Sequence, residues 1–210
     1  SGFADAVMVV SAPFAVAYGL NLLNNSLIID IGAGTVDFCT MHGTIPDNDD
    51  QKAILTAGDY VDEQLFSYLI EKYPNSKFNR NMVRRFKEEY SFVGESSEPI
   101  QVVIPVDGKP VMHDITNEMR KACESILPAI IETTAEMIAR FDPEFQVRIK
   151  NNIILSGGGC KIRGIDKYLK NALKEIGECD VRCVEDPLFV VSDGAMSLAK
   201  DMPDKYWAEM

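Results

Sequence analysis

The sequence SLIIDIGAGTVDFC, residues 26–39, places an apolar run directly before an acid, a group of small residues and a second acid. Residues 27–31 are apolar apart from one acid, which is typical of a buried strand. Gly32 and Gly34 follow, and glycine inside a strand packs nothing and loses backbone entropy. We therefore expect residues 27–31 and 35–42 to form a β-hairpin whose turn lets a phosphate or another backbone come close.

A second stretch, NNIILSGGGCKIRGI at residues 151–165, also sets an apolar strand before a glycine cluster. Neither cluster is a dinucleotide fingerprint, because Gly34 leads into another strand, and neither contains a P-loop. Backbone amides in such turns suit a phosphate or a nucleotide base. An acid beside a phosphate implies Mg²⁺ or an activated water between them. Two tight turns without a ligand remain the alternative.

Composition limits the class of protein. With 210 residues, 46% of them hydrophobic, the chain can bury a core for one large domain or two small ones. A net charge of -11 argues against binding to nucleic acid or to an anionic membrane. Five cysteines without a CxxC spacing favour reduced thiols over a disulfide framework or a zinc site. No apolar run reaches the ~20 residues of a membrane helix, so we expect a cytoplasmic protein without a transmembrane segment.

Strand and helix patterns intermix along the chain, which indicates an α/β fold. The patterns predict strands over residues 6–10, 27–31, 35–42, 52–56, 100–106, 111–115, 153–155 and 181–184. They predict helices that end near residue 19 and that cover residues 59–73, 80–90, 116–138, 141–148, 165–176 and 190–199. Asp107 and Gly108 supply the turn of a second hairpin, and Pro128 is expected to kink the long helix.

Four segments together resemble the actin-like ATPase superfamily, which also includes sugar kinases and heat-shock chaperone ATPases. DIGAGTVD (30–37) is similar to the second phosphate-binding hairpin of that family, and ILSGGGCKIRGI (154–165) is similar to its adenosine loop. RRFKEEYSFVG (84–94) is similar to the segment whose Lys-Glu pair faces adenine and ribose. TAGDYVDEQL (56–65) matches a turn on the cleft side. The four segments occur in the order of the family.

The resemblance implies an actin-like (ribonuclease H-like) ATPase fold, with a mixed sheet flanked by helices and a small inserted α+β subdomain. Residues 1–20 would end the first domain, and 191–210 would be a C-terminal helical segment that returns to it. Residues 21–72 and 116–190 would form the lower part of the second domain, the wall of the nucleotide cleft, and 73–115 the inserted subdomain. The N-terminal half of the family, with its first phosphate loop, is missing from this sequence, and alone these residues should hydrolyse ATP very weakly.

The resemblance also implies a site for ATP or ADP with Mg²⁺. Asp30 would be both a catalytic residue and a metal ligand, because it would bear on Mg²⁺ and on the hydrolytic water. Lys87 and Glu88 match the pair that faces adenine and ribose. In full, the nucleotide-binding positions implied are Gly32, Ala33, Gly34, Thr35, Gly58, Asp59, Lys87, Glu88, Gly157, Gly158, Gly159, Lys161 and Ile162.

One position departs from the family pattern. In VVSAPFAVAYG (9–19), bacterial actins usually carry Glu where this chain has Ala12. That Glu is expected to orient or activate the attacking water, and alanine can do neither. We therefore expect nucleotide binding and polymerisation to survive while hydrolysis is impaired.

A closer similarity extends along nearly the whole chain. The segments PVDGKPV (105–111), FDPEFQ (141–146) and MPDKYW (202–207) are similar to the magnetosome actins, bacterial proteins whose filaments organise magnetosomes. The similarity implies a subunit that self-associates into cytoskeletal filaments alongside magnetosome membranes, with magnetosome-associated proteins as further partners. A kinase or a chaperone-type ATPase of the same superfamily is the alternative.

The remaining reactive side chains are interpreted as structural. Cys160 lies in the segment similar to the adenosine loop, and we interpret it as a small residue beside the nucleotide. A redox role is the alternative, but the sequence offers no evident partner cysteine. His42 and His113 lie far apart on strand-like segments and are expected to have structural or surface roles.

Overall fold

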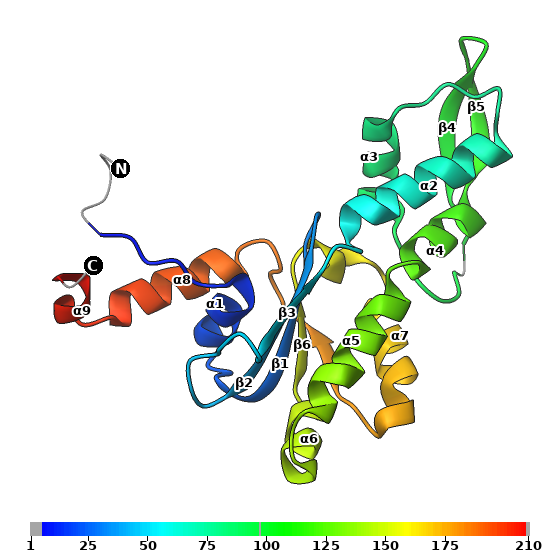
Figure 1. Ribbon diagram of the computed structural model, residues 1–210. Helices are drawn as coiled ribbons and strands as arrows, with labels where there is room; N and C mark the ends of the chain where they lie inside the picture. The colour runs from blue at the N-terminus through cyan, green and yellow to red at the C-terminus, as the bar shows by residue number, and fades with distance from the viewer. Residues whose placement is uncertain (1–5, 97, 209–210) are drawn as a thin grey trace.

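A computed structural model describes residues 6–96 and 98–208. At its centre lies a five-stranded mixed sheet with the strand order β3-β2-β1-β6-β7 (Figure 1). The strands are β1 (Asn24–Ile31), β2 (Val36–His42), β3 (Gln51–Ile54), β6 (Ile153–Ser156) and β7 (Val181–Cys183). The first three pair antiparallel, as the sequence predicts for the hairpin, while β6 runs parallel to both β1 and β7.

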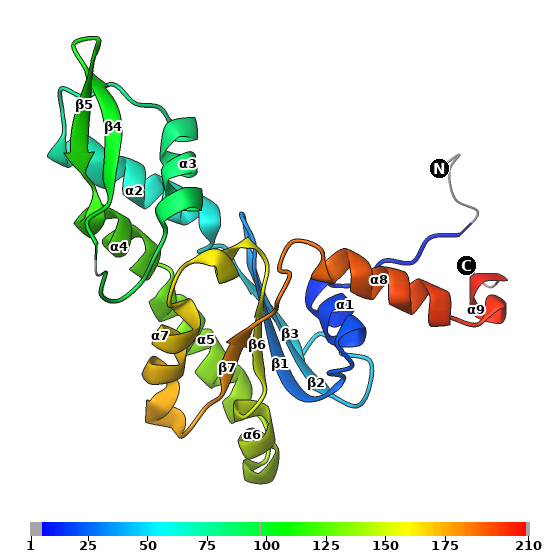
Figure 2. The ribbon, with the colours of Figure 1, turned by 180° about the vertical axis from the view of Figure 1, so that it is seen from behind.

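Helices cover both faces of this sheet (Figures 1 and 2). One face carries α1 (Ala12–Gly19) and α8 (Val190–Asp201), and the other carries α5 (Leu127–Ala139) and α7 (Ile165–Ala172). The shorter helices α6 (Pro143–Lys150) and α9 (Asp204–Ala208) follow α5 and α8 along the chain. Within residues 6–96 and 98–208, no helix combines the length and the apolar character that crossing a membrane demands.

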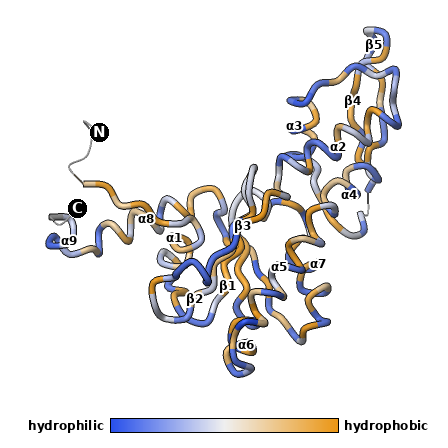
Figure 3. Tube along the Cα trace, viewed as in Figure 1, coloured by the Kyte–Doolittle hydropathy of each residue, from blue (hydrophilic) through white to orange (hydrophobic). Residues whose placement is uncertain are grey.

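The side chains of β1 alternate between the two layers, as the two-residue period of a strand requires. Leu27 and Ile29 belong to the large core on the side of α5 and α7, whereas Ile28 packs with Val16 of α1 and Val190 of α8. Figure 3 shows the resulting concentration of hydrophobic residues along the central strands. Burial on both faces explains why this stretch reads as a nearly continuous apolar run.

The helices α1 and α8 touch through their backbones. A Cβ atom on Gly194 would lie 1.9 Å from the backbone oxygen of Ala15. A Cβ atom on Gly19 would lie 2.7 Å from the Cα atom of Gly194. Glycine at both positions is therefore what allows the two helices to cross at this separation.

A smaller unit lies beyond one end of the sheet (Figure 1). Its elements are α2 (Gly58–Lys72), α3 (Arg80–Tyr90), β4 (Gln101–Val106), β5 (Lys109–Asp114) and α4 (Thr116–Glu124). Asn79 caps α3, because its side chain accepts a hydrogen bond from the backbone N–H of Met82 at 2.9 Å. Asp107 and Gly108 form the turn of the β4–β5 hairpin with φ angles of 50° and 77°, as the sequence predicts.

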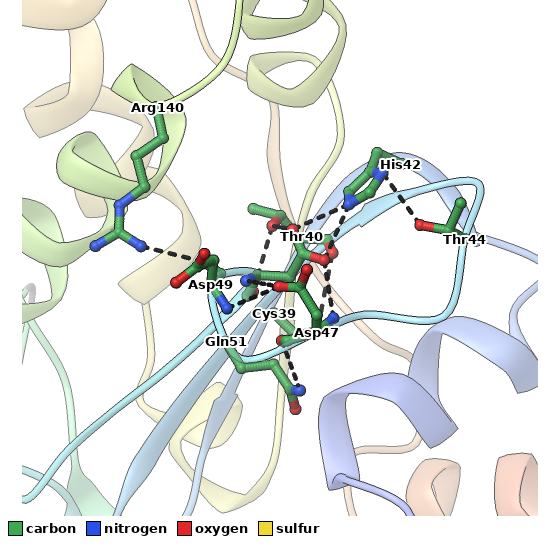
Figure 4. Close-up of polar contacts among 9 residues, drawn as sticks. Cys39, Thr40, His42, Thr44, Asp47, Asp49, Gln51 and Arg140 are labelled. Atoms are coloured by element: carbon green, nitrogen blue, oxygen red, sulfur yellow. Dashed lines mark hydrogen bonds and ion pairs between the residues drawn. The ribbon is translucent and has the colours of Figure 1, made fainter.

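The loop between β2 and β3 is held by Asp50, which is only 7% exposed. Its carboxylate lies 2.9 Å from Nε2 of His42 and accepts a hydrogen bond from the backbone N–H of Asp47 at 3.0 Å. From α5, the guanidinium of Arg140 donates to the backbone oxygen of Asp49 at 3.1 Å (Figure 4). These contacts tie the loop to the sheet and to α5, which agrees with a structural role for His42.

One predicted strand is wrong. Residues 6–10 form no strand, and none of the strands in the described part of the chain pairs with them. Val9 is 90% exposed, although the segment 6–10 is as apolar in sequence as a typical buried strand. A strand needs a neighbouring backbone to satisfy its N–H and C=O groups, and apolar composition alone does not supply one.

The helix predicted over residues 116–138 is instead two helices, α4 and α5, separated at Ser125 and Ile126. Pro128 is the second residue of α5, in the first turn, where its missing N–H costs no intrahelical hydrogen bond. The proline therefore begins a new helix rather than kinking a continuous one. The strand β3 covers residues 51–54 instead of 52–56.

Candidate functional site

The ends of β1 and β6 bring an acid and a hydroxyl together. The two strands are parallel neighbours, and Asp30 lies opposite Ser156. Oγ of Ser156 donates a hydrogen bond to Oδ1 of Asp30 at 2.7 Å. Partial burial raises the pKa of Asp30 above its ordinary value; the Ser156 hydrogen bond lowers it and the nearby charge of Asp37 raises it. A cation at this position would favour the charged form of the carboxylate.

The turn between β1 and β2 is anchored to the start of α2. The turn is closed by a hydrogen bond from the backbone N–H of Gly32 to the oxygen of Thr35, at 2.9 Å. Gly58 N–H then donates to the oxygen of Gly32 at 3.1 Å, and Asp59 N–H donates to the oxygen of Ala33 at 2.7 Å. A Cβ atom on Gly58 would lie only 3.1 Å from the same Gly32 oxygen. Glycine at the first position of α2 thus allows the hairpin turn to pack closely against the start of this helix.

The second glycine cluster presses against the end of β1. Gly157 has a φ of 76°, and a Cβ atom there would lie 2.6 Å from the oxygen of Ile31 and 2.7 Å from Oδ1 of Asp30. A Cβ atom on Gly159 would lie 2.1 Å from Cγ2 of Ile31. A Cβ atom on Gly158 would meet nothing within 4 Å. Two of the three glycines therefore serve a close backbone approach, and the third does not.

These segments enclose a cavity of about 340 Å³, together with α3 and the 3₁₀ turn η1 (Gly158–Lys161). This volume is within the range of small-molecule sites. The lining residues that the sequence predicts are Gly32, Ala33, Gly58, Lys87, Glu88, Gly158, Gly159, Lys161 and Ile162. The predicted residues that do not line it are Gly34, Thr35, Asp59 and Gly157. The cavity thus joins parts of all four segments that carry the family resemblance.

Sequence reasoning missed several lining residues. They are Ile31, Val61, Ser91, Ile126 and Leu188. Val61 and Ile126 follow helical apolar patterns, which indicate only that they face a core. Leu188 is 60% exposed in the loop before α8, and nothing in its sequence context separates it from any other surface leucine.

Lys87 is held at the cavity by two groups from α2. Its Nζ atom donates to the backbone oxygen of Gly58 at 2.9 Å. The same atom forms an ion pair with Oδ1 of Asp62 at 3.0 Å. Arg84 also pairs with Asp62 at 3.2 Å and with Asp59 at 3.0 Å. Because the side chains of Lys87 and Asp62 are only 15% and 11% exposed, this pair fixes α3 against α2.

Two predicted catalytic positions lie outside the lining of the cavity. Asp30 directly precedes the lining residue Ile31, and Ala12 is the half-buried first residue of α1. In the described part of the chain, no three His, Cys, Asp or Glu side chains are grouped so that they could hold a metal ion. Asp30 can therefore offer one carboxylate ligand without forming a complete protein cage.

Comparison with known proteins gives a consistent result. A family profile described as MreB/Mbl protein matches residues 2–206. The actin-like protein MamK of Magnetospirillum gryphiswaldense is 42% identical to this chain over 203 residues, which cover 97% of the chain and 56% of that protein. The chain thus spans about half the length of the curated relatives it matches.

Two solved structures share the fold. A MamK double helical filament superposes with a TM-score of 0.90 at 42% identity, covering 93% of this chain and 60% of that one. A non-polymerising MamK mutant bound to AMPPNP superposes with a TM-score of 0.86 at 42% identity, covering 92% of this chain and 60% of that one.

The substitution Gly157→Ala tests whether the close approach of the glycine cluster to β1 stabilises the site. We expect the free energy of unfolding to fall by about 2–4 kcal/mol, because alanine is strained at this positive φ and its Cβ must displace Asp30 and Ile31. Urea unfolding would measure the change. The matched control Gly158→Ala has free space and should stay within about 0.5 kcal/mol of the parent. Equal losses in both variants would show that the close approach is unimportant.

Proposed function

The chain belongs to the MreB/Mbl family of actin-like proteins, and from that membership we propose that it binds ATP with Mg²⁺ and polymerises into cytoskeletal filaments. The actin-like fold predicted from the sequence is confirmed, with its mixed sheet, flanking helices and small α+β unit. The division of the chain into residues 1–20, 21–72 with 116–190, 73–115 and 191–210 remains part of the proposal.

The cavity of about 340 Å³ is the observation that carries this proposal. Its walls come from the hairpin turn, the start of α2, the end of α3 and η1, which are separated along the chain and meet at this cavity. The AMPPNP complex of a MamK mutant, 42% identical to this chain, supports a nucleotide as the occupant. We assign the phosphates to the turn at residues 32–35, and the adenosine to η1, Lys87 and Glu88.

Asp30 is assigned to the metal and to water. Carboxylate oxygen is the ligand type that Mg²⁺ prefers, and bound Mg²⁺ would neutralise charge on the phosphates. The hydrogen bond from Ser156 fixes the orientation of the carboxylate, so Asp30 can accept a hydrogen bond from water at the strand end.

Hydrolysis is proposed to be slow in this chain. Ala12 occupies the position at which bacterial actins usually carry Glu, and a methyl group cannot take a proton from water. Binding and turnover are then separated, because the cavity and Asp30 are retained while the general base is absent.

The cellular role that we propose follows from the similarity to magnetosome actins. The filaments would lie in the cytoplasm alongside magnetosome membranes and would organise and position magnetosomes, with magnetosome-associated proteins as further partners. Self-association is supported by the double helical filament of MamK. The net charge of -11 supports the expectation that nucleic acid is not a partner.

Polymerisation of the purified protein, at its full natural length, tests this function. Addition of ATP and Mg²⁺ should raise light scattering and give filaments in electron micrographs, with slow phosphate release. The same preparation without nucleotide is the control. The absence of filaments under every nucleotide and salt condition would contradict the cytoskeletal function, and phosphate transfer to a small molecule would favour a kinase.

The substitution Ala12→Glu tests the missing general base. Phosphate release should rise by roughly 10²–10⁴-fold, the range for a positioned general base, while nucleotide affinity changes little. Ala12→Gln is the matched control, because it adds a side chain of the same size that cannot accept the proton. An unchanged rate in the Glu variant would show that the role assigned to position 12 is wrong.

The substitution Glu88→Ala tests the assignment of the adenosine end of the cavity. Nucleotide affinity should fall about tenfold, because a carboxylate hydrogen bond to a ribose hydroxyl is worth roughly 1.5 kcal/mol. Competition with a fluorescent ATP analogue would measure it. Glu89→Ala is the control, since Glu89 is exposed beside Glu88 but does not line the cavity. Equal affinities for both variants would contradict the assignment.

A further inference from the structure

Two cysteines lie together beside the candidate nucleotide cavity, although they are 23 positions apart in the sequence. The sulfur of Cys183 lies 3.8 Å from the backbone oxygen of Cys160, and each of the two thiols shifts the pKa of the other. Both are free thiols and both are half-buried. The sequence makes no partner of Cys160 evident, because Cys183 is close to it in space only.

The parallel pairing of β6 with β7 creates this juxtaposition. Cys183 is the last residue of β7 and pairs with Leu155 of β6, and the backbone N–H of Val184 donates to the oxygen of Leu155 at 3.0 Å. Cys160 follows the end of β6 within the 3₁₀ turn η1, where its backbone N–H donates to the oxygen of Gly157 at 3.1 Å. The turn folds the chain back over the end of the neighbouring strand.

The pKa values of the two thiols are shifted in opposite directions. The hydrogen bond shared with Cys160 holds the pKa of the Cys183 thiol below its ordinary value, although burial acts in the opposite direction. The pKa of Cys160 is raised by the same hydrogen bond, by burial and by the charges of Cys183 and Asp30. Cys183 is therefore the better thiolate, and Cys160 is the thiol that stabilises it.

Access also distinguishes Cys183 from the three buried cysteines. Cys183 lines a separate cavity of about 540 Å³ between β7 and α8, which gives a small molecule a route to this residue. Cys39 and Cys123 are buried, and burial raises the pKa of each to about 12. Cys179 is buried as well, and its pKa is also raised by burial.

We propose that Cys160 and Cys183 form a redox-active dithiol, at which a peroxide closes a disulfide bond that weakens nucleotide binding in the adjacent cavity. The effect on nucleotide binding rests on the proposed function, whereas the formation of the disulfide does not.

The chemistry balances with the peroxide as a two-electron oxidant. The Cys183 thiolate attacks one peroxide oxygen, an S–O bond forms, the O–O bond breaks, and the leaving oxygen is protonated to water or an alcohol. The Cys160 thiolate, after it loses its proton, then attacks the sulfur of the sulfenic acid. The S–S bond forms and hydroxide leaves as water. Two thiols are oxidised to one disulfide, and one peroxide is reduced.

Closure of the disulfide would move residues that line the candidate nucleotide cavity. An S–S bond of about 2 Å requires the sulfurs to come closer than two thiols in contact, so the bond draws η1 and the end of β7 together. Gly159 and Lys161, on either side of Cys160, line the candidate nucleotide cavity. Gly159 also packs against Ile31, which lines the same cavity, so a shift of η1 changes the lining at both residues.

The disulfide is tested on the wild-type protein with hydrogen peroxide. Thiols are blocked with an alkylating agent after treatment, and non-reduced peptides are mapped by mass spectrometry. We expect one species, in which the peptides of Cys160 and Cys183 are joined, and its loss on reduction with dithiothreitol. Cys160→Ser and Cys183→Ser should each abolish it, while Cys179→Ser, the matched control, should leave it unchanged. Failure to find this pair in the oxidised wild type would overturn the proposal.

Nucleotide binding is measured on the same samples with a fluorescent ATP analogue. The oxidised wild type should bind at least about fivefold more weakly than the reduced protein, the lower end of coupling between two sites. Reduction should restore affinity, and oxidised Cys183→Ser should bind like its reduced form. A disulfide that leaves the affinity unchanged would overturn the coupling. If the reduced protein bound no nucleotide, the proposed function would fail, while the peptide map would still decide whether the dithiol exists.

Discussion

The parallel pairing of β1 with β6 is the constraint on which the site depends. It places Asp30 beside Ser156 across a sequence separation of 126 residues, and it delivers the glycine cluster that follows β6 to the end of β1. Ligands in α/β sheets commonly bind at the carboxyl ends of the strands, where loops diverge. Burial on both faces of β1 secures this pairing, because a shift of register by one residue would exchange the two cores.

The site is also a junction between the sheet and the smaller unit. Two backbone hydrogen bonds join the hairpin turn to α2, and each stabilises this junction by about 1 kcal/mol. The ion pair of Lys87 with Asp62 joins α2 to α3. A ligand in the cavity would contact the turn, α3 and η1 together, so its binding would further stabilise the arrangement of these three segments. The placement of the smaller unit against the sheet would then depend on occupancy.

Sequence patterns predicted the parts of this fold that are determined by residues close together in the chain. The hairpin around Gly32, the cap at Asn79 and the turn at Asp107 each follow from neighbouring residues, and the structure contains all three. The strand expected at residues 6–10 failed because pairing depends on a distant backbone. Leu188 and Cys183 were missed for the same reason, since each acquires its neighbours only through the packing of β6, β7 and α8. Most of the residues that line the cavity lie in the motifs that carry the family resemblance, because those motifs already combine distant segments.

The contact between Gly19 and Gly194 has a consequence for the divergence of this sequence. The overlap that a methyl group would cause is with the main chain of the opposite helix, at 1.9 Å from the oxygen of Ala15 for position 194. No change of a neighbouring side chain can make room there, so a replacement at either glycine has no compensating partner. A side chain at either position would push the two helices apart, so the crossing of α1 and α8 constrains both positions together.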